Sequence, residues 1–389
     1  MEKVKADSTR ALVNHWRIFR LIGVHPPSKD TMWGRNYTLY SIVWNVTFHL
    51  FIWLSFSVNF LLSNSLETFC ESLCVAMPHT LYMLKLFNVY WTRNELLHSN
   101  RVFRYLDRRL VSSDEFRIVN EGVQKAEFIF RIISHGVVVI VALAIFYISV
   151  ASEPTLMYPS WIPWNWKDSS TLCLPTIILH SSAITETALT VLSLSTYPGT
   201  YLILVSAHTK ALAFRVSKLG YGRRLSEDRM LAILNGYIKD HQIILKLFKS
   251  LERSLSMTCF LQFVCTASAQ CTICYFLLFE QVGIMRFANM AMLLVAFTTE
   301  TILLCYTAEL LCKEGESLLT AVYSSNWLDQ SVRFRRHLLL MLVRCKKPLI
   351  LVSGAIVPVS MKTFMLMIKG AYTMLTLLNE MRKSSLENN

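Results

Sequence analysis

The chain has 389 residues, of which 53% are hydrophobic and 17% are charged, and its formal net charge is +13. Soluble domains carry about 25% charged residues, so this composition argues against a soluble protein and favours an integral membrane protein. The basic surplus lies between apolar stretches, where it orients a membrane protein and contacts anionic lipid, and it gives no reason to expect nucleic-acid binding.

The N-terminal segment 1–37 carries seven Lys and Arg residues before any long apolar run. A cleavable signal peptide would place its apolar core much earlier, so we expect a cytoplasmic tail and a first span that acts as the insertion signal. Seven apolar stretches follow in one membrane domain, each with the roughly 20 residues that a spanning helix needs. They are about 38–62, 66–90, 129–151, 173–206, 254–279, 284–312 and 358–381.

The Lys and Arg residues between these stretches predict the orientation, because cytoplasmic loops collect positive charge. The N-terminal tail and loops 91–128, 207–253 and 313–357 together hold 31 of them, whereas the alternate loops and the C-terminal tail hold four. We therefore expect the N-terminus in the cytoplasm and the C-terminus outside. This orientation is opposite to that of a G-protein-coupled receptor.

The cytoplasmic loop 207–253 contains an apolar repeat with alternating steps of four and three residues. A 3.5-residue period places one narrow apolar seam along a helix. This helix would run on into the fifth span, and segment 91–128 is also helical in pattern. The repeat consists of Met230, Leu234, Tyr237, His241, Ile244, Phe248, Leu251 and Leu255.

The sequence therefore predicts an all-α membrane protein with seven transmembrane helices and the N-terminus inside. Its cytoplasmic helical anchor region would consist of the extended helices four to six and the start of helix seven. The fourth apolar stretch, 173–206, is too long for one straight span and is expected to continue into this region. Here subunits would meet.

The outer loop 152–172 is rich in proline and tryptophan, with Trp161, Trp164 and Trp166 close together. Aromatic side chains favour the bilayer interface, so this loop is either an interfacial anchor or a lid over an outward-facing ligand site. Both interpretations remain open from the sequence.

Near the middle of the expected spans lie three charged residues, Glu186, Glu300 and Lys369. Each costs about 3 kcal/mol on insertion scales when it is unpaired, so we expect each to face protein or water. Gly354 and Pro358 interrupt the last apolar run, so 349–357 is expected to be a separate cytoplasmic piece.

A small-molecule site is expected at the outer ends of spans two to six, where aromatic and aliphatic side chains are mixed with a few hydrogen-bonding groups. Ordinary helix packing is the alternative for each of these residues. The candidates are Met77, Phe146, Tyr147, Val150, His180, Ile184, Thr187, Tyr275 and Phe297.

The C-terminal region 309–381 carries a recognisable set of residues, and Tyr197-Pro198-Gly199-Thr200-Tyr201 accompanies it. The C-terminal set is Glu314, Ser317, Ala321, Tyr323, Trp327, Arg335–Arg336, Pro348-Leu349, Gly354, Phe364, Lys369, Ala371-Tyr372-Thr373 and Leu377-Leu378. With seven spans, an inside N-terminus and this length, the chain resembles the insect odorant receptors over essentially its whole length.

The resemblance implies an odorant-gated, non-selective cation channel of four subunits around a pore lined by the last helix. The loop between spans four and five is shorter than in the family's shared coreceptor, which implies a ligand-tuning subunit that assembles with that coreceptor. The ligand would be a small volatile odorant, and the location the plasma membrane of olfactory sensory neurons.

Aligned on Tyr372-Thr373, Leu377 and Met381 take the family's gate positions, on one helix face because they are four residues apart. Glu380 would lie at the outer mouth and attract cations. Ordinary packing or lipid contact is the alternative for the two apolar residues.

Other classes of membrane protein fit less well. A transporter would show an internal repeat with paired broken helices, and only the last span is clearly interrupted. An enzyme would show a catalytic constellation, yet the sequence contains no His-Glu-x-x-His, Gly-x-Ser-x-Gly or phosphate-binding glycine loop. We expect no enzymatic activity, no metal and no cofactor.

Overall fold

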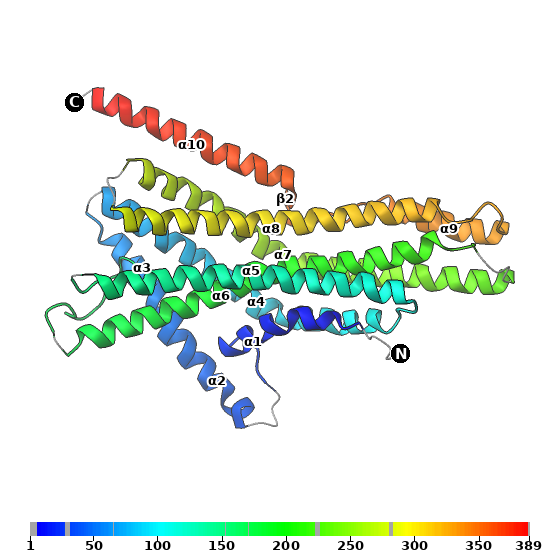
Figure 1. Cartoon of the computed structure of the whole chain (residues 1–389), viewed down its shortest axis with the longest axis horizontal. Coiled ribbons are helices and arrows are strands. Elements are labelled where there is room, and N and C mark those ends of the chain that lie inside the picture. The colour runs from blue at the N-terminus through cyan, green and yellow to red at the C-terminus, as the bar shows by residue number, and fades with distance from the viewer. Residues whose placement is uncertain are drawn as a thin grey trace.

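Long helices dominate the computed structural model, which describes residues 6–27, 32–64, 66–151, 153–169, 171–221, 226–279 and 283–387 (Figure 1). In these residues the only strands are β1 (Val352–Ser353) and β2 (Val357–Pro358), so the all-α prediction is confirmed apart from one short hairpin. The helices are η1 (Ser8–Leu12), α1 (Val13–Leu21), α2 (Met32–Trp44), η2 (Asn45–Leu50), α3 (Phe51–Leu61), α4 (Leu66–Asp107), α5 (Ser113–Val150), α6 (Cys173–Ser217), α7 (Glu227–Phe279), α8 (Ile284–Tyr323), α9 (Val332–Cys345) and α10 (Met361–Glu387).

Helices α4 to α8 each continue from an apolar segment into a polar one without a break. α5 starts with a capping box, in which the Ser112 hydroxyl accepts from the Glu115 amide at 3.2 Å and the Glu115 carboxylate accepts from the Ser112 amide at 3.4 Å. The apolar seam expected in loop 207–253 is buried within α7, where Leu234, Leu251 and Leu255 are each 0% exposed. The loop is therefore largely an extension of the fifth helix.

Five helical segments of the described chain are long and apolar enough to cross a bilayer, namely 34–61, 113–150, 173–217, 227–276 and 287–323. Among the described residues, the helices that contain the expected second and seventh spans, α4 and α10, fall short of this standard. Both carry charged residues in their apolar stretches, including Lys85 in α4 and Lys369 in α10. The seven-span expectation is consistent with the architecture, and its boundaries stay predictions.

The first expected span consists of α2, η2 and α3 in one continuous rod, in which η2 is a π-helical segment. A π-helical turn holds one more residue than an α-helical turn and often marks a functional position. It contains His49, which is 0% exposed.

Helix α6 forms the centre of the protein, and α5, α7 and α8 lie along it (Figure 1). Tyr197 and Tyr201 of α6 are almost completely buried, and the Tyr197 hydroxyl lies 2.9 Å from the Thr258 hydroxyl of α7. A Cβ added to Gly199 would lie 3.3 Å from the Thr307 hydroxyl, so this glycine lets α6 and α8 approach closely. The core thus contains the Tyr197–Tyr201 motif.

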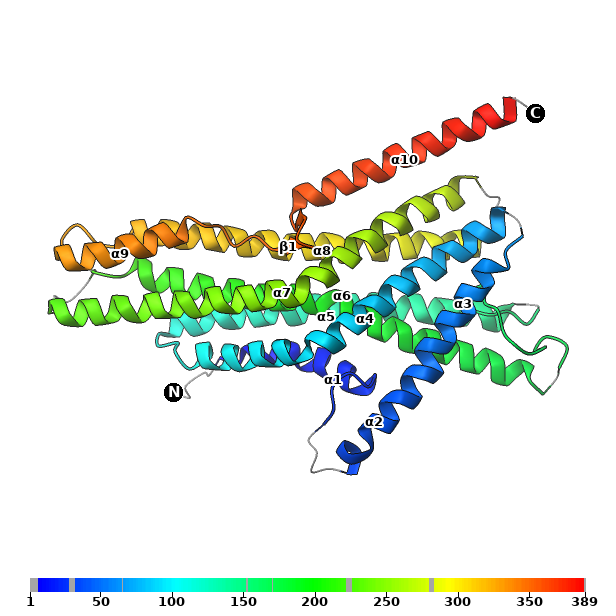
Figure 2. The same cartoon turned by 180° about the vertical axis from the view of Figure 1, so that it is seen from behind.

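The helices separate towards the end that carries the C-terminus, because α4 and α7 lean to one side there and α6 leans to the other (Figure 2). At the opposite end α9 packs on α7 and α8. The N-terminal segment also lies towards that end, where the Ser8 hydroxyl donates to Asp107 of α4 at 2.7 Å. The two termini therefore lie towards opposite ends of the long axis.

Between α9 and α10 the chain forms the β1–β2 hairpin, with Gly354 at φ +58°. A Cβ at Gly354 would lie 2.8 Å from the Phe260 ring, so a larger residue would not fit. The expected span 358–381 therefore includes the end of the hairpin. Helix α10 then leans away from the bundle and exposes Met365, Leu366, Tyr372, Met374 and Leu377 (Figure 2).

Candidate ligand-binding site

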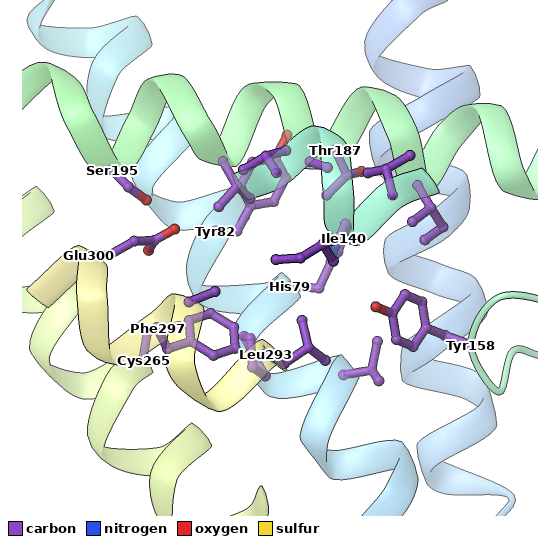
Figure 3. Close-up of a pocket in the computed structure, with 18 of the residues that line it drawn as sticks. His79, Tyr82, Ile140, Tyr158, Thr187, Ser195, Cys265, Leu293, Phe297 and Glu300 are labelled. Carbon is purple, nitrogen blue, oxygen red and sulfur yellow. The ribbon is translucent and has the colours of Figure 1, made fainter. Parts of the chain in front are cut away.

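An inner cavity of about 190 Å³ lies where the helices separate (Figure 3). Its walls come mainly from α4, α5, α6 and α8, and most of the lining is aliphatic or aromatic, as in Ile140, Ile184 and Phe297. Pockets for drug-sized ligands measure about 300–1,000 Å³. The inner cavity therefore suits a smaller and mostly apolar molecule.

One end of the inner cavity carries two buried charges. Lys85 is 4% exposed and Glu300 is 8% exposed. The side chain of Gln262 accepts a hydrogen bond from Lys85 Nζ and donates to Glu300 Oε2 at 3.2 Å. This arrangement provides the partner that a charge needs inside a membrane, as expected for Glu300.

A second polar cluster surrounds Glu186, beside the inner cavity. Its Oε1 accepts from Trp44 Nε1 at 3.3 Å and from the Thr190 hydroxyl at 3.0 Å, and it lies 3.3 Å from His49 Nε2. The Tyr82 hydroxyl lies 3.0 Å from His49 Nδ1, within hydrogen-bond distance, and Tyr82 lines the cavity. Glu186 therefore faces protein, and its cluster joins the π-helical segment to α4 and α6.

An outer cavity of about 520 Å³ lies closer to the outer loop. Phe146 and Tyr147 of α5 line it, together with loop residues 154–160 and Asn289 of α8. Ala144, Met157 and Tyr158 line both cavities. Tyr158 therefore forms part of the wall between them, with its hydroxyl towards the inner cavity (Figure 3).

Hydrogen bonds hold the outer loop against the helices. The Trp161 amide donates to the Ser55 carbonyl at 3.2 Å, and Trp164 Nε1 donates to the Thr176 hydroxyl at 2.9 Å. The Ser160 hydroxyl lies 2.8 Å from His180 Nε2. The loop thus covers the outer side of both cavities, which favours the lid interpretation.

The predicted ligand residues separate into three groups. Ile184, Thr187 and Phe297 line the inner cavity, whereas Phe146 and Tyr147 line the outer one. The remaining candidates line neither cavity, although His180 supports the loop through Ser160. These are Met77, Val150, His180 and Tyr275.

Sequence reasoning missed the polar face of α4. His79, Tyr82 and Lys85 follow one another at three-residue steps and line the inner cavity. Residues three apart share a helix face, and a lysine inside a span indicates a functional site. This spacing was the signal that could have identified them.

The predicted gate residues lie far along the chain from both cavities, on α10. Leu377 is 53% exposed and Glu380 is also exposed. Met381 belongs to α10, but its side chain lies outside the described residues. Lys369 is exposed on the same helix.

Comparisons with known proteins give one consistent result. A family model described as "7tm Odorant receptor" matches residues 65–372. "Putative odorant receptor 19b" and "Odorant receptor 19a" of Drosophila melanogaster are each 71% identical over 387 residues, covering 100% of both chains. "Odorant receptor 2a" of the same fly is 27% identical over 97% of this chain and 98% of its own.

Among solved structures, the insect olfactory receptor OR5 from Machilis hrabei in complex with eugenol superimposes with a TM-score of 0.77. The match covers 97% of this chain and 100% of that chain at 14% sequence identity. The same receptor described without a ligand gives the same score. At this identity the likeness shows a shared fold.

Proposed function

The chain belongs to the insect odorant receptor family, and from this membership we propose that it is the odorant-binding, tuning subunit of an odorant-gated cation channel. Membership of a receptor family also confirms that the chain is not an enzyme. The fold agrees with that of an insect olfactory receptor.

The observation that carries the proposal is the inner cavity under the outer loop. It is mostly apolar and bounded by long helices that continue to the opposite end of the protein. Burial of about 250 Å² of apolar ligand surface at ~25 cal/mol/Å² would provide roughly 6 kcal/mol. This corresponds to a dissociation constant in the tens of micromolar, which suits reversible detection of a small volatile molecule.

The exposed side of α10 supports the channel half of the proposal. Four such helices around an axis would line a pore, with Leu377 and Met381 as an apolar constriction that blocks ions by dewetting. Glu380 would attract cations at the outer mouth. An odorant opens the pore only if it binds the open form more tightly than the closed form.

Assembly with the coreceptor would use the cytoplasmic anchor region. Leu339, Leu340 and Val343 of α9 are between 58% and 71% exposed, and they offer an apolar contact surface outside the membrane. We place the N-terminus in the cytoplasm, the C-terminus outside, and the heterotetramer in the plasma membrane of olfactory sensory neurons.

The test is the current through an excised patch that contains this chain and the coreceptor, without GTP, during pulses of an odorant panel. A cation current that is lost when this chain is omitted supports the proposal. A response that needs GTP and intact cells would instead indicate signalling through a G protein and would reject it.

A matched pair of alanines tests the cavity in the same assay. Ala188 lines the inner cavity, whereas Ala142 is exposed on α5 and does not line it. Ala188→Phe should fill the cavity and weaken odorant responses without removing spontaneous current. Ala142→Phe makes the same chemical change on the outer surface and should leave the responses unchanged.

A further inference from the structure

Three buried polar atoms of the inner cavity have no hydrogen-bond partner among the described residues, namely Nε2 of His79 on α4 and the hydroxyls of Thr187 and Ser195 on α6. The Ser195 hydroxyl has the Glu300 carboxylate beside it, which leaves His79 and Thr187 for a ligand. Both residues line the cavity, and Figure 3 shows them near its centre and at one side. A buried polar group without a partner is costly, so such a pair indicates a place for a polar atom of a ligand.

Thr187 differs from its neighbours on α6. The hydroxyls of Thr185 and Thr190 donate to the backbone carbonyls four residues earlier, at 2.8 and 3.1 Å. Within the described chain the Thr187 hydroxyl makes no such bond. It therefore stays available to donate to a ligand as well as to accept from one.

The two ring nitrogens of His79 have different surroundings. The ring interacts with the backbone carbonyl of His49, in the π-helical segment, and Nε2 is the nitrogen without a partner. A carbonyl only accepts, so the proton is assigned to Nδ1 and Nε2 of the neutral ring is an acceptor. His79 is 5% exposed and packs edge-on against Phe56, which fixes its ring.

The other polar groups of this cavity lie beside polar groups of the protein. The Tyr82 hydroxyl lies 3.0 Å from His49 Nδ1, Lys85 and Glu300 share Gln262, and the Ser195 hydroxyl lies beside the Glu300 carboxylate. The Asn289 side chain faces the Tyr158 hydroxyl. The free acceptor of His79 and the free hydroxyl of Thr187 are thus the groups that a ligand can satisfy.

We propose that His79 and Thr187 form a polar subsite that selects small apolar alcohols. This inference rests on the proposed odorant-binding function and states which chemical class the cavity prefers. An alcohol donates its proton to His79 Nε2 and accepts from the Thr187 hydroxyl. An aldehyde or ketone only accepts and satisfies Thr187 alone, and a hydrocarbon satisfies neither, so affinity should fall in that order.

The test is direct binding to the purified full-length chain, measured from the ligand-dependent rise of its melting temperature. The probes are straight-chain primary alcohols from butanol to decanol, each with the aldehyde of equal length and the alkane that has one more carbon. We expect the best alcohol to bind about tenfold more tightly than its alkane, as one to two hydrogen bonds allow.

Three variants locate the preference. Thr187→Val is nearly isosteric and should reduce alcohol affinity several-fold, while alkane affinity stays equal or rises. His79→Leu should have the same effect. If His79→Leu does not fold, the result for Thr187→Val decides the test. Ser195→Ala is the matched control, because it also removes a buried hydroxyl from the same cavity. Ser195 lies about 12 Å from Thr187 along α6, at 1.5 Å per residue.

Three results would each overturn the subsite. The first is that no alcohol in the series binds better than its alkane. The second is that Thr187→Val leaves the alcohol-to-alkane affinity ratio unchanged, and the third is that Ser195→Ala changes this ratio as much as Thr187→Val does. Binding is measured without a coreceptor and without a current, so the two proposals can fail separately. If the chain binds alcohols selectively but gives no odorant-evoked current, the proposed channel function is rejected and the subsite is retained.

Discussion

Lys85 of α4 and Glu300 of α8 are connected through one amide, because both hydrogen-bond the side chain of Gln262 on α7. Removal of either charge leaves the other buried without its counter-charge, which costs about 3–5 kcal/mol. We therefore expect Lys85→Met and Glu300→Gln each to lower the melting temperature of the purified chain.

The Lys85→Met/Glu300→Gln double variant should be more stable than the sum of the two single effects implies. A double-mutant cycle on unfolding free energies measures this coupling. If the two changes are additive, the charges act independently, and their connection through Gln262 contributes nothing to stability.

Two glycines of α5 should respond in opposite ways to substitution by alanine. A Cβ at Gly122 would lie 2.6 Å from Ala207 Cβ, whereas a Cβ at Gly136 meets no described atom within 4 Å. Overpacking costs about 1–3 kcal/mol, and alanine favours a helix over glycine by about 1 kcal/mol. Gly122→Ala should therefore be neutral to destabilising, and Gly136→Ala neutral to stabilising.

Melting temperatures of the two glycine variants test this difference. The Gly122→Ala/Ala207→Gly double variant should recover the space and the stability of the natural chain. If both alanines shift the melting temperature equally, the contact between α5 and α6 is not close enough to matter.

His241 predicts a pH dependence in the cytoplasmic anchor region. Burial and the nearby Arg344 lower its pKa from 6.5 to about 4. The unfolded chain then binds a proton that the folded chain does not, so stability is full above pH 6.5 and falls as the pH drops towards 4. The loss approaches roughly 3 kcal/mol.

The measurement compares unfolding of the purified natural chain and His241→Gln between pH 7 and pH 4. His15, whose pKa burial lowers to about 3, contributes in the same direction, so the informative quantity is the difference between the two chains. The variant should lose less stability on acidification. Equal losses would show that His241 is not protonated on unfolding in this range.

Tyr158 should control the size of acceptable odorants, because it forms part of the wall between the two cavities. Tyr158→Ala should join the cavities and raise the potency of bulky odorants by about tenfold relative to small ones, equivalent to 1.4 kcal/mol. Dose–response currents over a series of increasing ligand size measure this change.

Tyr147→Ala is the control for Tyr158, since Tyr147 lines only the outer cavity. It removes the same side chain without opening the inner cavity. An identical size profile for the natural chain and Tyr158→Ala would mean that the wall depends on Met157 and the loop backbone instead.

The hydrophobic periodicity of the sequence predicted those features that depend on a single helix, such as which of its faces is buried. The 3.5-residue seam of α7 is buried because a repeat in one segment determines which face of that helix is apolar. The ligand site depends on how several helices are rotated about their axes, which no single repeat specifies. Met77 and His79 show the consequence. They are two residues apart on α4, so their side chains point about 200° apart around the helix, and of the two only His79 lines the cavity.

The residues expected at the outer ends of the helices differ in where the structure puts them. Ile184, Thr187 and Phe297 line the inner cavity, whereas Val150 ends α5 with its side chain 65% exposed. Treating Lys85 as a membrane-embedded charge would have indicated the polar face of α4. The loop contacts of Tyr158 and Trp161 depend on tertiary structure and have no comparable signal.

The π-helical segment of the first span limits which codon deletions the gene for this chain can tolerate. Loss of one codon from Asn45–Leu50 would remove the extra residue and rotate α2 by about 100° relative to α3, while α1 stays packed on α6. Trp44 would then lose Glu186, and Tyr37 would lose the Arg20 carbonyl to which it donates at 2.8 Å. The shortened segment would still be apolar enough to insert, so its length is constrained separately from its hydropathy.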